Sequence, residues 1–399
     1  MEGVEVPGDV FFPKRTQTQM AAVRKCCSDT DTMALPWSCV CAELKRYKPS
    51  KFCPNYAGLC VQSLYFSVMN SHESHDGIGQ ELGDRTTWKY LGACRRRFVW
   101  RNPFLGRFES HWKPFLTSKS LCSLMDRPFK GEFEAVLWFC KLPFGLQSSV
   151  LSAFTTLQLL PEQELPGSFG HLWCQRCIVV SNGYSIHGQR FGKIIDSHHV
   201  IIRLNDAPVK EHKKDVGERT SIRLFFPESA LPNPLENSDN DTLMVLVPFK
   251  PLDFLWLREV LLKTRKKTKV GVWRQPPWEW RGNVSQLRIL NPYVTYEATY
   301  KLLQLNASSG MFSLFPSWRY ATTGIIALNL ALRMCQEVNI AGFGYPGNHA
   351  NTTPIHYYNM GHSRKKELFQ HSITAERNWL LKMIELGVIA DIASPSFQA

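Results

Sequence analysis

The sequence lacks a long uninterrupted apolar run. Its longest mostly apolar stretch, Leu142 to Pro161, is broken by polar residues such as Gln147 and Thr155, and it falls short of the roughly 18 apolar residues of a membrane-spanning helix. The first 30 residues contain no apolar segment of the kind found in secretory signal peptides. Internal repeats and low-complexity tracts are also missing. We therefore expect no membrane span, signal peptide or repeat architecture in this sequence.

Acidic residues are fewer than basic residues. The 399 residues include 34 Asp and Glu against 47 Lys and Arg, which gives a net charge of +13. Such a balance favours anionic partners: phosphates, acidic sugars, nucleic acid or a membrane surface. Basic residues do not cluster with interleaved aromatic residues, so we do not expect a nucleic-acid-binding protein. A hydrophobic content of 44% excludes a disordered chain and is ample for a domain-sized core.

Cysteine becomes rare after residue 140, where only Cys174, Cys177 and Cys335 follow. The earlier cysteines between residues 26 and 41 lack the Cys-x-x-Cys spacing of zinc sites. Cys174 and Cys177 have that spacing, but Cys177 opens an apolar strand rather than a helix. A lumenal protein with one or two disulfides fits this pattern better than a metal or redox site.

The character of the sequence changes near residue 141. Residues 1–140 show no clear periodicity, whereas afterwards short apolar runs alternate with turn signals and helical segments, the pattern of an α/β fold. Strands are predicted over 177–180, 200–204, 220–226, 242–247, 287–290 and 338–343. Helices are predicted over 192–196, 252–262, 294–303, 322–334 and from an N-cap at Thr374 to about 386. We expect an ill-defined N-terminal region over 1–140 and one α/β domain over 141–399, with a Rossmann-like, mostly parallel sheet flanked by helices.

Candidate binding residues follow the predicted strands. Asn182 and Asn205 come directly after two strands, where open α/β sheets bind ligands, and their amides suit a nucleotide's phosphate or base. Either Asn alone is equally explained as a turn residue that stabilises its own backbone. Thr322, Thr323 and Gly324 begin a long helix, whose N-terminal N–H groups and dipole favour an anion. Ordinary N-capping explains that segment as well.

Two histidines are candidates for acid–base chemistry. His356 follows the glycine-rich turn after the last predicted strand, and His371 precedes the final helix, with Glu376 five residues further on. Histidine is the usual general base near neutral pH. A single loop histidine is most simply an exposed one, but two that bracket this region indicate a functional site.

An acidic Asp-x-Asp motif at Asp239 and Asp241 has the form that many glycosyltransferases use to hold a metal. It lies in a polar loop before a strand and overlaps a glycosylation sequon, so we do not expect it to bind metal. Sequons place candidate glycosylation sites at Asn240, Asn283, Asn306 and Asn351.

Four segments of the chain, in order, resemble the motifs of the eukaryotic sialyltransferases. Residues 177–230 resemble the large sialylmotif, with Cys-Ile-Val-Val-Ser-Asn-Gly at the start and Phe-Pro-Glu-Ser-Ala at the end. Residues 322–343 resemble the small motif, 356–358 the third motif, and His371 with Glu376 the very small motif. Matches between the motifs, such as Val-Pro-Phe-Lys at 247–250, are similar to the β-galactoside α-2,3-sialyltransferases that act on Galβ1-4GlcNAc ends. The resemblance covers about residues 141–394.

The resemblance implies roles for individual residues. Cys177 and Cys335 match the cysteines joined by a disulfide in this family, and Asn182 and Asn205 match asparagines that contact the CMP part of the donor. The small-motif segment around the cytidine and phosphate is matched by Tyr320, Thr322, Thr323 and Gly324. His356 matches a histidine that faces the donor phosphate, and His371 matches the catalytic base.

The resemblance also implies an activity. It implies a GT-A-like variant fold, no metal or other cofactor, CMP-sialic acid as donor, and galactose-terminated glycans of glycoproteins or glycolipids as acceptors. It implies a place in the Golgi lumen or membrane. A sialyltransferase of another linkage, one that uses lactosylceramide, and an inactive lumenal protein that only binds CMP-sugar stay open as alternatives.

The sequence departs from the family pattern at two positions of the candidate site. Ser181 stands where the family usually has Gly, and Ala321 stands where Pro is usual. The first change is expected to crowd the donor turn. The second is expected to leave the entry to the 322–334 helix less fixed, because Ala does not restrict φ as Pro does.

Overall fold

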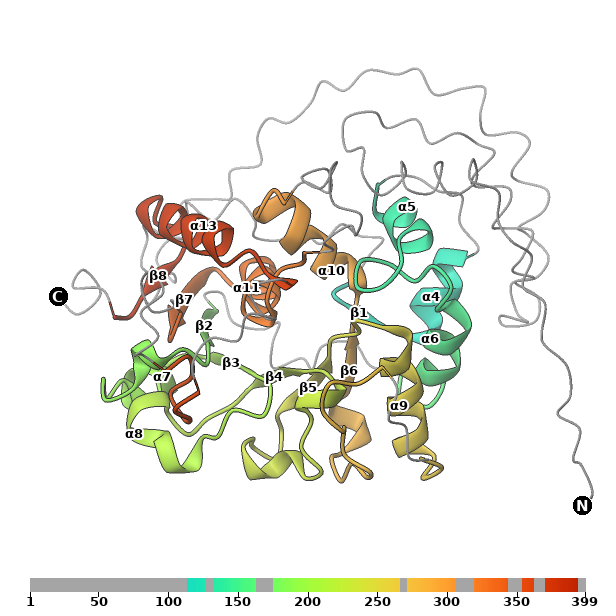
Figure 1. Cartoon of the computed structure of the whole chain (residues 1–399), viewed down its shortest axis with the longest axis horizontal. Helices are drawn as coiled ribbons and strands as arrows, with labels where there is room; N and C mark the ends of the chain where they lie inside the picture. Colours follow the sequence, from blue (N-terminus) through green and yellow to red (C-terminus); the bar gives the residue numbers. More distant parts are fainter. Residues whose placement is uncertain are drawn as a thin grey trace, which may run out of the picture. The chain divides into compact units, whose positions relative to one another are not determined.

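One mixed sheet organises the computed structural model, which describes residues 113–125, 132–162, 175–265, 271–305, 319–343, 354–361 and 370–393. Within these residues eight strands lie in the order β1-β6-β5-β4-β3-β2-β7-β8 (Figure 1). They are β1 (Phe115–Leu116), β2 (Arg176–Val180), β3 (Val200–Leu204), β4 (Ile222–Phe225), β5 (Leu243–Leu246), β6 (Leu287–Leu290), β7 (Glu337–Ala341) and β8 (Ala390–Asp391). Only the β1–β6 pair among them is antiparallel. The expected Rossmann-like, mostly parallel sheet is confirmed.

Helices connect and flank these strands. Those of at least four residues in the described ranges are α4 (Ser118–Met125), α5 (Glu132–Phe139), α6 (Val150–Leu157), α7 (Gly192–Asp196), α8 (Lys213–Val216), α9 (Pro251–Leu261), α10 (Pro292–Tyr296), the π-helix η11 (Glu297–Leu302), α11 (Thr323–Met334) and α13 (Ile373–Glu385). None of the described helices has the length and apolar character needed to span a bilayer.

The two faces of the sheet carry alternate residues of the same strands. Ile178 and Val180 of β2 pack in one cluster with Phe191 and Ile195 around α7. Cys177 and Val179, which point to the opposite face because side chains alternate along a strand, are fully buried. Helix α11 packs against β2, β3, β4 and β7 and is buried along almost its whole length. Both faces are therefore covered, which explains why these strands are continuous apolar runs.

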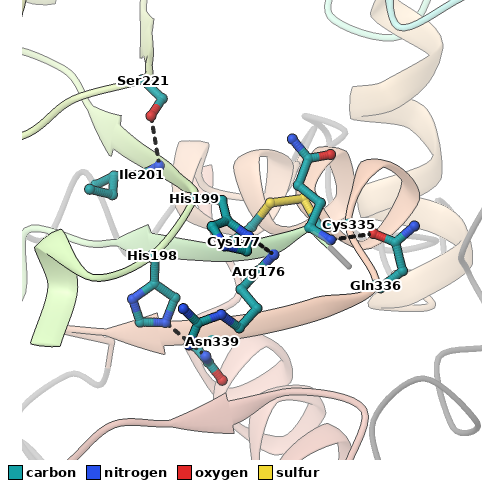
Figure 2. Close-up of a disulfide and its surroundings, with 10 residues drawn as sticks. Arg176, Cys177, His198, His199, Ile201, Ser221, Cys335, Gln336 and Asn339 are labelled. Atoms are coloured by element: carbon teal, nitrogen blue, oxygen red, sulfur yellow. Dashed lines mark hydrogen bonds between the residues drawn. A yellow bond between two sulfur atoms is a disulfide. The ribbon is translucent and has the colours of Figure 1, made fainter. Parts of the chain in front are cut away.

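A disulfide joins strand β2 to the end of helix α11. Cys177 and Cys335 are bonded across 158 residues of sequence, with their Cα atoms 6.1 Å apart (Figure 2). Beside them, the Gln175 N–H donates to Gln336 Oε1 at 2.8 Å. The pairing implied by the family resemblance is confirmed, and it fixes the α11 helix to the centre of the sheet.

Two local predictions were wrong. The helix predicted over 294–303 begins earlier, at Pro292 after the N-cap Asn291, and changes to a π-helix from Glu297. The N-cap of α13 is Ser372, not Thr374. Both errors arise because capping residues recur within a few positions, so the sequence does not decide which one begins the helix.

The sheet also includes residues before position 141. Strand β1 pairs with β6, Phe115 opposite Leu290, and helix α5 packs against α10. The division of the chain into 1–140 and 141–399 stays a prediction.

Candidate active site

The candidate site lies at the carboxyl ends of the parallel strands. Asn182 follows β2, Asn205 follows β3, and His356 pairs with Gly183 in an isolated antiparallel bridge. Neighbouring main-chain bonds hold this bridge: the Tyr184 N–H donates to the Ile355 carbonyl and the Tyr357 N–H to the Asn182 carbonyl. The segment that carries His356 is thus laid directly against the turn that carries Asn182, as open α/β folds would place a ligand site.

The side chains of this half of the site are tightly packed. The His356 ring stacks on Tyr358, with centroids 5.2 Å apart and planes 7° apart. Burial raises the pKa of the Tyr358 hydroxyl, and a hydrogen bond with the Asn182 side chain opposes that rise. Burial also raises the pKa of Tyr357 to about 12, and its hydroxyl donates to the Pro208 carbonyl at 2.7 Å. Both phenols therefore stay protonated at neutral pH, and Tyr357 ties the His356 segment to the loop after Asn205.

Asn205 has a strained but well-supported backbone. Its φ of +57° is in the left-handed region, which Asn tolerates better than most residues. The buried Arg223 guanidinium donates to the Asn205 carbonyl at 2.8 Å, and the Ser229 hydroxyl donates to Asn205 Oδ1 at 3.2 Å. Sequence reasoning missed Arg223, although an arginine inside an apolar strand was a signal that a buried polar partner was needed.

The other half of the site is built around His371. Its Nδ1 lies 2.8 Å from the Tyr320 carbonyl. Since a carbonyl only accepts, Nδ1 carries the proton and the lone pair of the neutral ring is on Nε2. Burial lowers the pKa of His371, with the hydrogen bond to Tyr320 acting against it. The ring is thus neutral near physiological pH, with Nε2 able to take up a proton.

Glu376 binds Thr322, the N-cap of helix α11. Its two carboxylate oxygens accept from the N–H and the hydroxyl of Thr322, each at 2.8 Å. Burial raises the pKa of this carboxyl to about 7. The bond corrects one expectation, because the Thr322 N–H is engaged by Glu376 rather than offered to a donor phosphate. Thr323 and Gly324, in the first turn of α11, have no intrahelical acceptor for their N–H groups.

Phe343 and Gly342 connect the two halves. A Cβ on Gly324 would lie 3.2 Å from the Phe343 ring, so that ring covers the start of α11. Gly342 has a φ of +67°, and its carbonyl accepts from the Gly183 N–H at 3.0 Å. A Cβ on Gly342 would lie 2.7 Å from the Ser181 carbonyl oxygen, a contact that real Cβ atoms do not make. The structure therefore brings Asn182, His356 and the start of α11 together.

Both departures from the family pattern fit this backbone. Ser181 is not among the residues with positive φ, so its conformation does not require glycine. The Ala321 N–H donates to Thr299 Oγ1 at 3.1 Å. Proline has no N–H, so this bond fixes the entry to α11 by a different means.

The Asp-x-Asp loop engages its first carboxylate at the other end of β4 from the candidate site, although Arg223 links the preceding Asn237 and Ser238 to the Asn205 carbonyl. Asp239 Oδ2 accepts from the Thr220 N–H at 2.7 Å, and Thr220 precedes β4, whereas the site follows the strand ends. Within the described ranges, no three His, Cys, Asp or Glu side chains gather closely enough to hold a metal ion. Asn240 and Asn283 are exposed, while Asn306 and Asn351 lie outside the described residues.

A cluster of charged side chains, which the sequence did not suggest, stabilises the backbone beside the candidate site. Lys250, after β5, contacts the buried carboxylates of Glu228 and Asp253, each at 2.8 Å. Asp253 Oδ2 also accepts from the Phe249 N–H at 2.7 Å. The Phe249 ring lies 5.3 Å from that of Tyr320, whose carbonyl binds His371. The cluster thus fixes the backbone beside Tyr320.

Comparisons with known proteins agree on one family. The family described as glycosyltransferase family 29 (sialyltransferase) matches residues 128–388. CMP-N-acetylneuraminate-beta-galactosamide-alpha-2,3-sialyltransferase 4 of Rattus norvegicus is 38% identical over 252 residues, 63% of this chain and 74% of the relative. Its Homo sapiens counterpart is 36% identical over 274 residues, 67% of this chain and 80% of the relative. Type 2 lactosamine alpha-2,3-sialyltransferase of Rattus norvegicus is 38% identical over 252 residues, 63% of this chain and 74% of the relative.

Solved structures match the fold as well. A mammalian sialyltransferase crystal structure has a TM-score of 0.53 at 23% identity and covers 75% of this chain and 95% of its own. A mammalian sialyltransferase in complex with Gal-beta-1-3GalNAc-ortho-nitrophenol has a TM-score of 0.51 at 22% identity, over 75% of this chain and 96% of its own.

Proposed function

The chain belongs to glycosyltransferase family 29, the sialyltransferases, and we propose that it transfers sialic acid from CMP-sialic acid to the 3-hydroxyl of a terminal β-galactose. The relatives at 36–38% identity named above carry β-galactoside or lactosamine α-2,3-sialyltransferase activity in their names. The observation that carries the proposal is the contact between His371 Nδ1 and the Tyr320 carbonyl, which leaves Nε2 as the basic atom of a buried ring whose pKa burial lowers.

The proposed reaction is a single inverting displacement. The galactose 3-oxygen attacks C2 of sialic acid while its proton moves to His371 Nε2. The C2–O bond to the phosphate breaks, and its electron pair leaves with CMP. The β-linked donor becomes an α-linked product, so no covalent intermediate with the enzyme is required.

The leaving phosphate gains negative charge in this step. His356, the Tyr320 hydroxyl and the N–H groups of Thr323 and Gly324 are the donors we assign to that charge, since preorganised donors act most strongly where charge develops. Burial raises the pKa of Tyr320, which keeps its hydroxyl protonated and able to donate. Asn182 and Asn205 are assigned to the CMP part of the donor.

We further propose that the reaction needs no metal and takes place in the Golgi lumen. CMP leaves as a monophosphate, which carries less charge to neutralise than a diphosphate, and the proposed donors are histidine, tyrosine and backbone groups. A disulfide that closes the core is typical of proteins that fold in the secretory pathway.

The test is direct. The purified protein is incubated with CMP-sialic acid and a panel of galactosides, and the linkage of each product is determined by NMR and by a linkage-specific sialidase. An α-2,3-linked product on Galβ1-4GlcNAc is expected. Product in another linkage would overturn the assignment of the 3-hydroxyl, and binding of CMP-sialic acid without any transfer would favour the inactive CMP-sugar-binding alternative.

A further inference from the structure

Four aromatic rings run from the proposed base to the surface of the protein. We call Tyr320, Phe249, Phe226 and Trp273 the aromatic row. Tyr320 lies edge-on to His371 at 5.0 Å, and the successive centroid distances along the row are 5.3, 5.6 and 6.4 Å. All lie in the range of direct ring contacts. The row ends at Trp273, whose exposed fraction is 66%.

Two members of the row, Phe226 and Phe249, follow different strands than Asn182 and Asn205. Phe226 follows β4 and Phe249 follows β5, whereas Asn205 follows β3 and Asn182 follows β2. In the sheet these strands lie in the order β5-β4-β3-β2 (Figure 1). An acceptor galactose at His371 therefore has the nucleotide on the β2–β3 side and the aromatic row on the β4–β5 side.

Trp273 is exposed although the loop that carries it is fixed. The Trp256 indole N–H of α9 donates to the Pro277 carbonyl at 3.0 Å, and the Arg281 N–H donates to the Pro232 carbonyl at 2.8 Å. Arg274, the next residue, forms an ion pair with Asp206 at 2.7 Å. Because Asp206 directly follows Asn205, this ion pair ties the loop that carries Trp273 to the segment after β3.

The surroundings of Trp273 suit a sugar ring better than a lipid chain. The residues that follow it in the loop, Arg274 and Gln275, are exposed and polar, so hydrogen-bonding groups lie next to the exposed indole along the chain. A pyranose has the same division, with an apolar C–H face and a rim of hydroxyls.

Resting on the proposed function, we propose that Trp273 and Phe226 form a subsite for the sugar that precedes the terminal galactose. The C–H face of that sugar packs on the Trp273 indole, while the terminal galactose presents its 3-hydroxyl to His371 Nε2. Trp273 is then a specificity-determining residue, which favours disaccharide acceptors over simple galactosides and leaves donor binding unaffected.

The test compares two acceptors and three variants. Initial rates are measured with the methyl glycosides of Galβ1-4GlcNAc and of galactose for Trp273→Ala, Trp273→Phe and the matched control Trp278→Ala. Trp278 is exposed on the same loop but lies against Arg265, outside the aromatic row. Circular dichroism and thermal unfolding verify that each variant folds.

Trp273→Ala is expected to raise KM for the disaccharide about 3- to 10-fold, the range of a lost aromatic contact. KM for methyl galactoside and for CMP-sialic acid stays unchanged in Trp273→Ala. Trp273→Phe brings KM for the disaccharide most of the way back to the wild-type value, and Trp278→Ala behaves as wild type. An equal increase in KM for both acceptors, or no increase for either, overturns the subsite while leaving the proposed function intact.

If the wild type transfers no sialic acid, a measurement of disaccharide binding still tests the subsite separately from the transferase activity. Saturation-transfer NMR of the disaccharide, in the presence of CMP, then reports on the subsite alone. Binding that disappears in Trp273→Ala but persists in Trp278→Ala supports the subsite and overturns the transferase proposal; no binding to the wild type overturns the subsite too.

Discussion

Glu376 and Thr322 join the two helices that border the candidate active site. The carboxylate of Glu376, on α13, accepts from both the N–H and the hydroxyl of Thr322, the N-cap of α11. Fifty-four residues of sequence separate them. Because Tyr320 and His371 lie just before these two helices, the bond also sets the spacing of the proposed base and its carbonyl partner.

The buried Glu376 makes stability depend on pH. Its pKa is about 7 in the folded protein against an ordinary value of 4.5, so the folded state binds the proton more tightly. The contribution of the protonated Glu376 carboxyl to the free energy of unfolding is fully present below pH 4.5 and is lost as the pH rises through about 7. Glu376→Gln removes this titration, and we expect the free energy of unfolding of the wild type to fall relative to the variant by up to about 3 kcal/mol between pH 4.5 and 8.

Urea unfolding of both proteins at several pH values measures this difference. Glu385→Gln, an exposed change on the same helix, serves as the control and is expected to follow the wild type. Parallel curves for wild type and Glu376→Gln would show that the carboxyl does not titrate in this window.

Removal of the proposed base is expected to affect turnover rather than donor binding. His371→Ala lowers kcat by about 10²–10⁴, the usual contribution of a general base, while CMP binds with nearly unchanged affinity in calorimetry. His356→Ala is expected to weaken donor binding as well as turnover, because its proposed partner is the phosphate. Loss of CMP binding in His371→Ala with turnover per bound donor preserved would mean that the two roles are exchanged.

The pH profile of the reaction follows from the same residue. A base works in its neutral form, and burial holds the pKa of His371 below 6.5. The acid limb of kcat/KM is therefore expected below pH 6.5, and it disappears from the residual activity of His371→Asn. An acid limb above pH 6.5, or one that persists in the variant, would assign the titration to another group.

Metal chelation is expected to leave activity intact. Full activity in EDTA is the expected result, and Asp241→Ala changes neither rate nor stability. Asp239→Ala lowers the free energy of unfolding by about 1–3 kcal/mol, because the Thr220 N–H loses its acceptor. It leaves KM for CMP-sialic acid unchanged. Loss of transfer in EDTA with rescue by Mn²⁺ would show that a metal takes part.

The disulfide is expected to contribute strongly to stability. Chain entropy for a loop of 158 residues gives at most about 5 kcal/mol, which the double variant Cys177→Ala with Cys335→Ala loses. Peptide mapping without reductant should recover the bonded pair from the folded wild type. Alkylation of both thiols in folded protein would contradict the pairing.

The strands and the principal site residues could be predicted because their signals are local. Strands β3 and β6 match the predicted ranges, since each is a short apolar run bounded by turn residues. Asn182 and Asn205 follow such runs directly, and parallel strands carry their carboxyl ends to one edge of the sheet.

The remaining features depend on contacts between distant segments. Strand β1 is two residues long and has no periodicity of its own. The role of Glu376 depends on Thr322, which lies 54 residues away in the sequence. The aromatic row combines residues from four segments, so no spacing in the sequence indicates it.

Tyr320 contacts the proposed base through its backbone and the aromatic row through its ring. Every residue type supplies the same carbonyl, so exchange of the side chain at position 320 leaves the proton on His371 Nδ1 undisturbed. The backbone at position 320 therefore serves the base, while its side chain serves the leaving group and the aromatic row. Descendants of this scaffold, natural or engineered, can change the role of that side chain while the tautomer of His371 is inherited unchanged.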